Sequence, residues 1–476
     1  MKKSELSSGV FFTAIAKYSS VIIMLVVSAI LARLLTPEDF GTVTIATVIL
    51  SFFVIISDLG IATAIVQNKQ LTETDNNNIF SFTVYLGIGI AIIFYLLSPL
   101  VADFYDVKSI VYICRALSIN LLFASLNIVP NALLLKAKRF KFIAVRTILV
   151  QLVFGAISIF AAFKGLGIYA LLINPIGSSI AIFIFNYIQY PQKFSIHVER
   201  ESIDKISKYS MYQFLFSIIN YFSRNIDNLL IGRYIGIAQL GYYDKSYRLM
   251  MLPLSNIAHV ITPVLHPLLS EHQDDREYIF KSYLKLLNLL AYVGFPLSVF
   301  LYFEASNLIF IVFGSQWADS IPIFKILAIS VGAQMLTSSL GSIFQSTNET
   351  KRLFKIGNIN TATNVMAIVS ALVYFGSIKA VAIFITIAFY INAMVSFYYL
   401  FDRVFSKSVV KFVSILRNPI LLSILLVLIC KLTAGLFSNS IISLFTTFLI
   451  VSTASILFIQ LSKDFDLLKI IKSSKR

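Results

Sequence analysis

The chain has 476 residues, of which 58% are apolar or aromatic (AVILMFWYC) and 13% are charged, whereas an ordinary soluble domain has about 25% charged residues. A mean hydropathy of +0.85 places most of the chain in a lipid bilayer, which excludes a soluble enzyme, a nucleic-acid-binding domain and a secreted scaffold. The formal net charge of +16 lies in short segments between apolar runs, so anionic lipid headgroups rather than nucleic acid are its expected neighbours.

Long apolar runs recur along the whole chain and predict about fourteen membrane-spanning helices. The first run is too long for the apolar part of a signal peptide, so we expect it to span the membrane. Pro253, Pro263 and Pro267 fall within the eighth run, where ordinary kinks are favoured over a broken helix. The predicted spans lie near residues 10–35, 40–66, 79–100, 110–135, 143–163, 167–190, 207–232, 237–268, 279–303, 320–346, 353–375, 379–401, 415–436 and 440–461.

The distribution of lysine and arginine between alternate loops predicts the orientation of the chain. With a cytoplasmic N-terminus, roughly 28 of the 39 basic residues face the cytoplasm and about 7 face the outside. This asymmetry predicts a multi-pass protein with both termini in the cytoplasm. No predicted loop exceeds about 20 residues, which leaves no room for a globular domain outside the membrane. Any function must therefore operate within the helices.

Two short motifs repeat and predict a duplicated architecture. Residues 30–35, followed by Phe40 and Gly41, match residues 230–235, followed by Leu240 and Gly241, at a constant spacing of about 200 residues. A basic pair after the fourth span also recurs after the tenth. Six helices thus form the repeating unit, and two parallel repeats predict two lobes with a site between them.

We therefore expect an all-α integral membrane protein of two parallel six-helix lobes plus two C-terminal helices. The segment after the second lobe has aliphatic residues at helical spacing between basic residues, which fits either a helix on the inner membrane surface or a solvated connector. The predicted divisions are an N-terminal lobe at 1–190, a cytoplasmic linker at 191–206, a C-terminal lobe at 207–402, and a surface segment, two further spans and a basic tail at 403–476.

Several of these segments resemble a known family. The opening LARLLTPEDFG at residues 31–41, followed by Asp58-Leu59-Gly60, is similar to the start of bacterial polysaccharide exporters of the Wzx type. The stretch from Asn225 to Pro253 is the most specific part, and resembles the branch that exports colanic and teichuronic acid precursors. Residues 313–322, with Trp317, fit the same pattern.

The resemblance implies a flippase of the multidrug/oligosaccharidyl-lipid/polysaccharide exporter superfamily, and no enzyme activity. Such proteins move undecaprenyl-diphosphate-linked oligosaccharides from the cytoplasmic to the outer leaflet of the bacterial inner membrane. The implied partners are the lipid-linked oligosaccharide, membrane lipids, and polysaccharide polymerase and chain-length machinery. We expect no cofactor, no metal and no nucleic acid.

Cationic residues within spans are the natural partners of a diphosphate, because an unpaired ion in hydrocarbon costs tens of kcal/mol in the Born limit. Arg224 and Asn228 share a helix face, and Lys245 and Arg248 are three residues apart. The alternative is an ion-pair network through neighbouring aspartates that only fixes these helices. Lys17, about two turns into the first span, either faces the cavity or extends its ammonium to the membrane surface.

The acidic candidates for coupling to a proton or sodium ion are Asp58, Asp227 and Glu304, and helix-end solvation or a salt bridge is the structural alternative for each. A cation-coupled drug antiporter on the same fold is the main functional alternative. It would favour acidic groups within the spans, whereas the excess here is basic. A membrane polymerase or glycosyltransferase would need a long outer loop or an acidic motif. A major-facilitator carrier would need its glycine and basic signature after the second span. The sequence contains neither set of features.

Overall fold

The computed structural model describes residues 3–270, 275–433, 436 and 439–462, and this part of the chain forms helices without strands. The chain forms two compact units, Met1–Gly241 and Tyr242–Arg476. Eleven of the described helices are long and apolar enough to cross a membrane, and a bent pair of shorter helices makes a twelfth. The lobe boundaries expected from the sequence remain predictions, and the basic tail at 463–476 lies outside the described residues.

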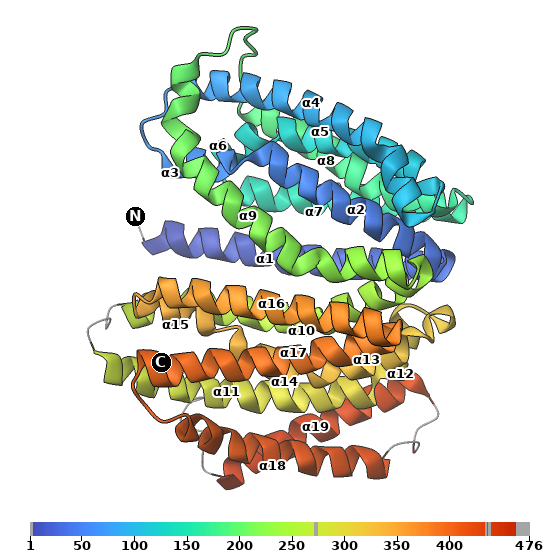
Figure 1. Ribbon diagram of the computed structural model, residues 1–476, viewed down its shortest axis with the longest axis vertical. Coiled ribbons are helices and arrows are strands. Elements are labelled where there is room, and N and C mark those ends of the chain that lie inside the picture. Colours follow the sequence, from blue (N-terminus) through green and yellow to red (C-terminus); the bar gives the residue numbers. More distant parts are fainter. Residues whose placement is uncertain (1–2, 271–274, 434–435, 437–438, 463–476) are drawn as a thin grey trace. The chain divides into compact units, whose positions relative to one another are not determined.

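The first unit contains nine α-helices among its described residues, a short 3-10 helix at Gly167–Tyr169, and the first residues of α10 (Figure 1). Within it, α4 packs along α5, α1 packs along α7, and α9 packs on α2 and α4. The bounds are α1 Lys3–Leu34, α2 Pro37–Asp58, α3 Ile61–Gln67, α4 Glu73–Tyr105, α5 Ser109–Leu126, α6 Ile128–Lys136, α7 Phe140–Phe163, α8 Ala170–Gln189, α9 Arg200–Tyr234 and α10 Ile237–Ser270.

Capping residues determine where two of these helices begin. Thr36 caps α2 and Thr72 caps α4. In each case the carboxylate of an aspartate three residues later accepts a hydrogen bond from the backbone N–H of the capping threonine. Such capping boxes satisfy backbone N–H groups that have no partner inside the helix. Both aspartates also place negative charge at a helix N-terminus, where the helix dipole favours it.

One predicted span of the first unit is interrupted, and another contains a local irregularity. Span 40–66 breaks between α2 and α3, where Leu59 and Gly60 have φ of 46° and 75°. A Cβ on Gly60 would lie 2.7 Å from the carbonyl oxygen of Ser210 on α9, so the break requires glycine for both its conformation and its packing. Span 110–135 is confirmed as one membrane-crossing segment, Ser109–Lys136, in which a single turn residue, Asn127, lies between α5 and α6.

The second unit contains the rest of α10 and nine further α-helices among its described residues. Predicted span 320–346 is divided here, with a bend of 46° between α13 and the helices that follow it. A π-helix, Tyr399–Val404, extends the end of α17. The bounds are α11 Arg276–Phe303, α12 Ala305–Val312, α13 Ser320–Ile329, α14 Val331–Thr337, α15 Leu340–Ser346, α16 Thr350–Phe375, α17 Ile378–Tyr398, α18 Val410–Thr433 and α19 Ser440–Ser462.

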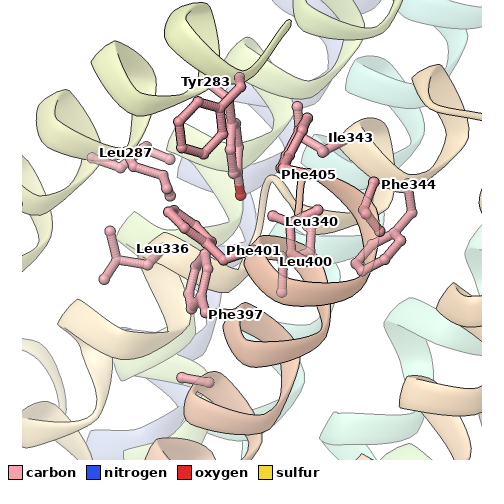
Figure 2. Packing of buried hydrophobic residues seen from close by; sticks show 14 of the residues in the cluster. Tyr283, Leu287, Leu336, Leu340, Ile343, Phe344, Phe397, Leu400, Phe401 and Phe405 are labelled. Atoms are coloured by element: carbon pink, nitrogen blue, oxygen red, sulfur yellow. The ribbon is translucent and has the colours of Figure 1, made fainter. Parts of the chain in front are cut away.

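An aromatic and aliphatic cluster forms the core of the second unit (Figure 2). Tyr283 and Leu287 from α11 point toward Leu336 from α14, Phe397 from α17 and Phe401 from the π-helix that follows it. The Tyr283 hydroxyl and the Ser339 hydroxyl are hydrogen-bonded at 3.1 Å, which satisfies the polar end of this buried ring. The cluster explains how the short helices α14 and α15 are held although neither spans a membrane alone.

A lysine–carboxylate pair recurs at equivalent positions of the two units. Lys205, at the start of α9, donates to Asp75 at the start of α4 over 2.9 Å. Lys407, just before α18, pairs with Glu277 at the start of α11 over 2.8 Å. The Asp75 carboxylate, as the hydrogen-bond acceptor, raises the pKa of the Lys205 ammonium above its ordinary value. The two lysines are separated in sequence by the same number of residues as the two carboxylates, as expected for a repeat.

The repeated glycines are also sites of close packing. A Cβ added to Gly41 on α2 would overlap the backbone carbonyl of Ile237 at the start of α10. A Cβ added to Gly241 on α10 would overlap the carbonyl of Pro37 at the start of α2. The two contacts are related by the repeat, and all four residues belong to the first unit.

Candidate functional site

The sequence-predicted cations fall in both units. Arg224 lies on α9 in the first unit with an exposed side chain, whereas Lys245 and Arg248 lie on α10 in the second unit. On α9, the Asp227 carboxylate accepts a hydrogen bond from the backbone N–H of Asn228 over 2.8 Å. The Asn228 amide oxygen is buried and accepts no hydrogen bond within the described part of the chain.

The α10 cluster combines an ion pair with a buried lysine. Arg248 Nε donates to both carboxylate oxygens of Asp244, each at 2.8 Å. Asp244 is buried, while the Arg248 side chain is 61% exposed. Lys245 is only 6% exposed, and its ammonium lies 5.5 Å from the ring centroid of Phe313. An ion pair with a neighbouring aspartate, as in the structural alternative, therefore forms at Arg248, and Lys245 is more enclosed than Arg248.

The acidic candidates have different surroundings. Asp58 ends α2 and accepts a hydrogen bond from the backbone N–H of Ala62, so it caps the short helix α3. Glu304 is 4% exposed between α11 and α12, and its carboxylate accepts hydrogen bonds from Asn307, Ser443 and Thr447. These donors are neutral groups on α12 and α19.

The sequence analysis missed a buried arginine. Arg146, in the second turn of α7, is 7% exposed and forms no ion pair within the described part of the chain. Its guanidinium donates to the amide oxygen of Asn186 on α8, and its Nε has no hydrogen-bond partner there. The Asn186 amide nitrogen donates in turn to the amide oxygens of Asn127 at 2.7 Å and Asn131 at 3.5 Å.

Lys17 lies at the same level as Arg146. The Lys141 ammonium of α7 is 5.9 Å from the ring centroid of Phe12 on α1. Counting the same number of residues onward from each of these two positions gives Arg146 on α7 and Lys17 on α1. A second contact, between Gly155 of α7 and a later turn of α1, confirms that the helices run parallel in this register. The Lys17 ammonium is buried and has no hydrogen-bond partner within the described residues. The first unit therefore holds two enclosed cations at one depth.

The polar network reaches a cavity of about 270 Å³. Residues beside the break between α2 and α3 and beside the turn at Asn127 between α5 and α6 line it, and α9 contributes Ser217 to its wall. Its polar lining consists of Asp58, Ser57, Asn127, Asn131 and Ser217. The cavity is thus partly open, with both polar and apolar side chains in its wall, and it lies wholly within the first unit.

Comparisons with known proteins place this arrangement in context. A sequence model of the family described as polysaccharide biosynthesis protein matches residues 30–322. The lipopolysaccharide biosynthesis protein WzxC of Escherichia coli (strain K12) is 26% identical over 425 residues, covering 88% of this chain and 85% of the relative. The teichuronic acid biosynthesis protein TuaB of Bacillus subtilis (strain 168) is 26% identical over 342 residues, covering 71% of each chain.

Solved structures share the fold at lower identity. The lipid II flippase MurJ, in an inward closed conformation, matches with a TM-score of 0.76 and 16% identity, covering 94% of this chain and 98% of that one. An inward-facing multidrug resistance MATE family transporter of the MOP superfamily matches with a TM-score of 0.61 and 16% identity, covering 81% and 94%. These likenesses show a shared helical membrane fold.

Proposed function

The chain belongs to the family of polysaccharide biosynthesis proteins, and on that premise we propose that it is a flippase and not an enzyme. It moves undecaprenyl-diphosphate-linked oligosaccharide from the cytoplasmic to the outer leaflet of the bacterial inner membrane, by alternating access, for surface polysaccharide synthesis. The observation that carries this proposal is the family match over residues 30–322, joined by relatives that serve lipopolysaccharide and teichuronic acid synthesis. Polysaccharide polymerase and chain-length machinery are its proposed partners.

The architecture that serves this function has fourteen spans in two parallel six-helix lobes with two further helices. Two features support this layout: the lysine–carboxylate pairs at equivalent positions and the repeated glycines of α2 and α10. Parallel repeats of this kind carry substrate between their lobes.

The cations inside the helices are the proposed binding groups for the diphosphate. They are Arg224, Lys245, Arg248 and Lys17, assisted by the Asn228 amide. A diphosphate cannot enter hydrocarbon without replacement of its hydration, and fixed ammonium and guanidinium groups supply that replacement. The burial of Lys245 and of the Lys17 ammonium supports the proposal, since an enclosed cation without a role is costly to retain.

Asp58, Asp227 and Glu304 remain the proposed groups for coupling to an ion. Of these, Glu304 has the most enclosed carboxylate, and Asp58 faces the cavity of the first unit. A drug antiporter for organic cations would need acidic groups in place of the basic ones that predominate here.

Deletion of the gene tests the proposed function directly. We expect the deletion strain to accumulate lipid-linked oligosaccharide in the cytoplasmic leaflet, because synthesis continues while transfer stops. Extraction and mass spectrometry of undecaprenyl-linked glycans measure this accumulation, and expression of the intact chain should reverse it. Normal surface polysaccharide with no accumulated intermediate would refute the proposal.

The orientation of the chain is tested with tags. Reporter tags at both termini, and in the loops that contain Lys138 and Lys205, should give a cytoplasmic signal, because basic residues concentrate on that side. A phosphatase and green-fluorescent-protein pair reports the two sides with opposite signals. An outer signal at either terminus would contradict the proposed number of spans.

A further inference from the structure

The hydrogen-bond directions around Arg146 determine what the cavity offers to a ligand. A guanidinium can only donate hydrogen bonds, so the amide oxygen of Asn186 must face it. The Asn186 nitrogen then donates to Asn127 and Asn131, which must present their oxygens to it. The amide nitrogens of both residues donate no hydrogen bond within the described part of the chain, and both residues line the cavity.

The same cavity also has hydrogen-bond acceptors on its wall. Asp58 contributes a carboxylate, of which one oxygen is already engaged with the backbone N–H of Ala62. Ser217 of α9 adds a hydroxyl group, which can donate or accept. Amide donors and a carboxylate acceptor therefore line one cavity.

This combination discriminates between ligand classes. A phosphate would meet the negative charge of Asp58, and a metal cation would meet the N–H groups of Asn127 and Asn131. A hydroxyl group both donates and accepts, so neighbouring hydroxyls on one ligand can satisfy both kinds of group. The volume of about 270 Å³ exceeds that of several water molecules and suits one compact polar ring.

We propose that this cavity binds the hydroxyl groups of a sugar in the oligosaccharide headgroup, with Asp58, Asn127 and Asn131 as the residues that recognise it. The proposal rests on the flippase function and adds a glycan subsite separate from the diphosphate-binding cations. Arg146 acts as a positioning residue, because it holds Asn186 in the orientation that frees the two amide nitrogens for the ligand.

Two substitutions test the subsite with little change of shape. Asn131→Asp keeps the oxygen that faces Asn186 and replaces the free amide nitrogen with a second acceptor. Asp58→Asn removes the charge while its side-chain oxygen can still cap α3. Asn120→Asp is the matched control, because Asn120 lies on α5 outside the cavity lining and donates to the Pro175 carbonyl.

The experiment measures binding of two radiolabelled probes to the purified full-length protein in lipid nanodiscs. One probe is undecaprenyl diphosphate without sugar, and the other is the undecaprenyl-linked oligosaccharide extracted from cells that make this protein. We expect Asn131→Asp and Asp58→Asn each to weaken binding of the glycan-bearing probe about fivefold to tenfold, as for loss of one hydrogen bond. Binding of the sugar-free probe should change less than about twofold, and Asn120→Asp should preserve the ratio between probes.

If a substitution weakened binding of both probes equally, or left the ratio of their affinities unchanged, the glycan subsite would be overturned and the flippase function would remain intact. Failure of the wild-type protein to bind either probe would overturn the proposed function and the subsite together. Thermal unfolding identifies a variant that does not fold, and Ser217→Ala, which removes one hydroxyl from the cavity wall, then supplies the same comparison.

Discussion

Replacement of Lys245 by methionine is expected to reduce flipping at least about tenfold, because a charge-assisted hydrogen bond to the diphosphate is worth about 1.5–3 kcal/mol. The fold should tolerate this change, because methionine has similar length and removes the cost of enclosing an ammonium group. Asp244 keeps its partner Arg248, so no carboxylate loses its principal ion pair. Lys245→Arg should retain more activity than Lys245→Met, since it preserves the charge.

Lys325 provides the matched control for Lys245. It also lies within an apolar helix, and its ammonium is 5.8 Å from the ring centroid of Tyr302, much like the arrangement of Lys245 over Phe313. Lys325 is not one of the proposed diphosphate-binding cations. The Lys325→Met variant should therefore flip lipid-linked oligosaccharide at nearly the wild-type rate in proteoliposomes. Normal flipping by a folded Lys245→Met variant would remove Lys245 from the proposed diphosphate site. Arg224→Gln and Arg248→Gln extend the same test to the other two cations.

The sequence predicts the presence of the apolar helices better than their continuity. Hydropathy is averaged over a window, and the apolar composition continues across the breaks in predicted spans 40–66 and 320–346, whereas predicted span 110–135 is one continuous segment. Only Gly60 gives a local signal, since its left-handed φ and its contact with Ser210 both need glycine. Asn127 gives none, because one asparagine is common inside a helix. Its role becomes visible only when α8 brings Asn186 beside it.

The cavity illustrates why some candidate residues escape sequence analysis. Arg146 follows a basic loop, and by sequence it belongs with the cytoplasmic charges that hold a helix end at the membrane surface. Its burial results from packing between helices, which no local pattern records. Asp58 was recognisable as an acidic residue within a predicted span, but the amides that line the cavity with it come from Asn127, between α5 and α6, and Asn131, on α6. The pair of Asp244 and Arg248 was predictable because helical spacing alone brings the two together.

The repeated glycines carry the second prediction of large effect. Gly41→Ala and Gly241→Ala should each reduce export at least about tenfold and destabilise the protein by about 1–3 kcal/mol, as overpacking does. In each case the new methyl group would overlap a backbone carbonyl, which cannot rotate away as a flexible side chain can. The starts of α2 and α10 would have to separate. Complementation of a deletion strain measures export, and thermal unfolding of the purified protein measures stability.

Gly89→Ala is the control for these substitutions, because Gly89 lies inside α4 with no neighbouring atom within 4 Å of an added Cβ. Alanine should be neutral or stabilising there, by up to about 1 kcal/mol, since it is the better helix former.

The double variant Gly41→Ala, Gly241→Ala adds a sharper test. Each single change already separates the same two helix starts, so the second change should destabilise the protein less than it does alone. The loss of stability in the double variant should therefore be smaller than the sum of the two single losses. Strict additivity, or a Gly41→Ala variant that behaves like Gly89→Ala, would show that the two glycines do not form one contact.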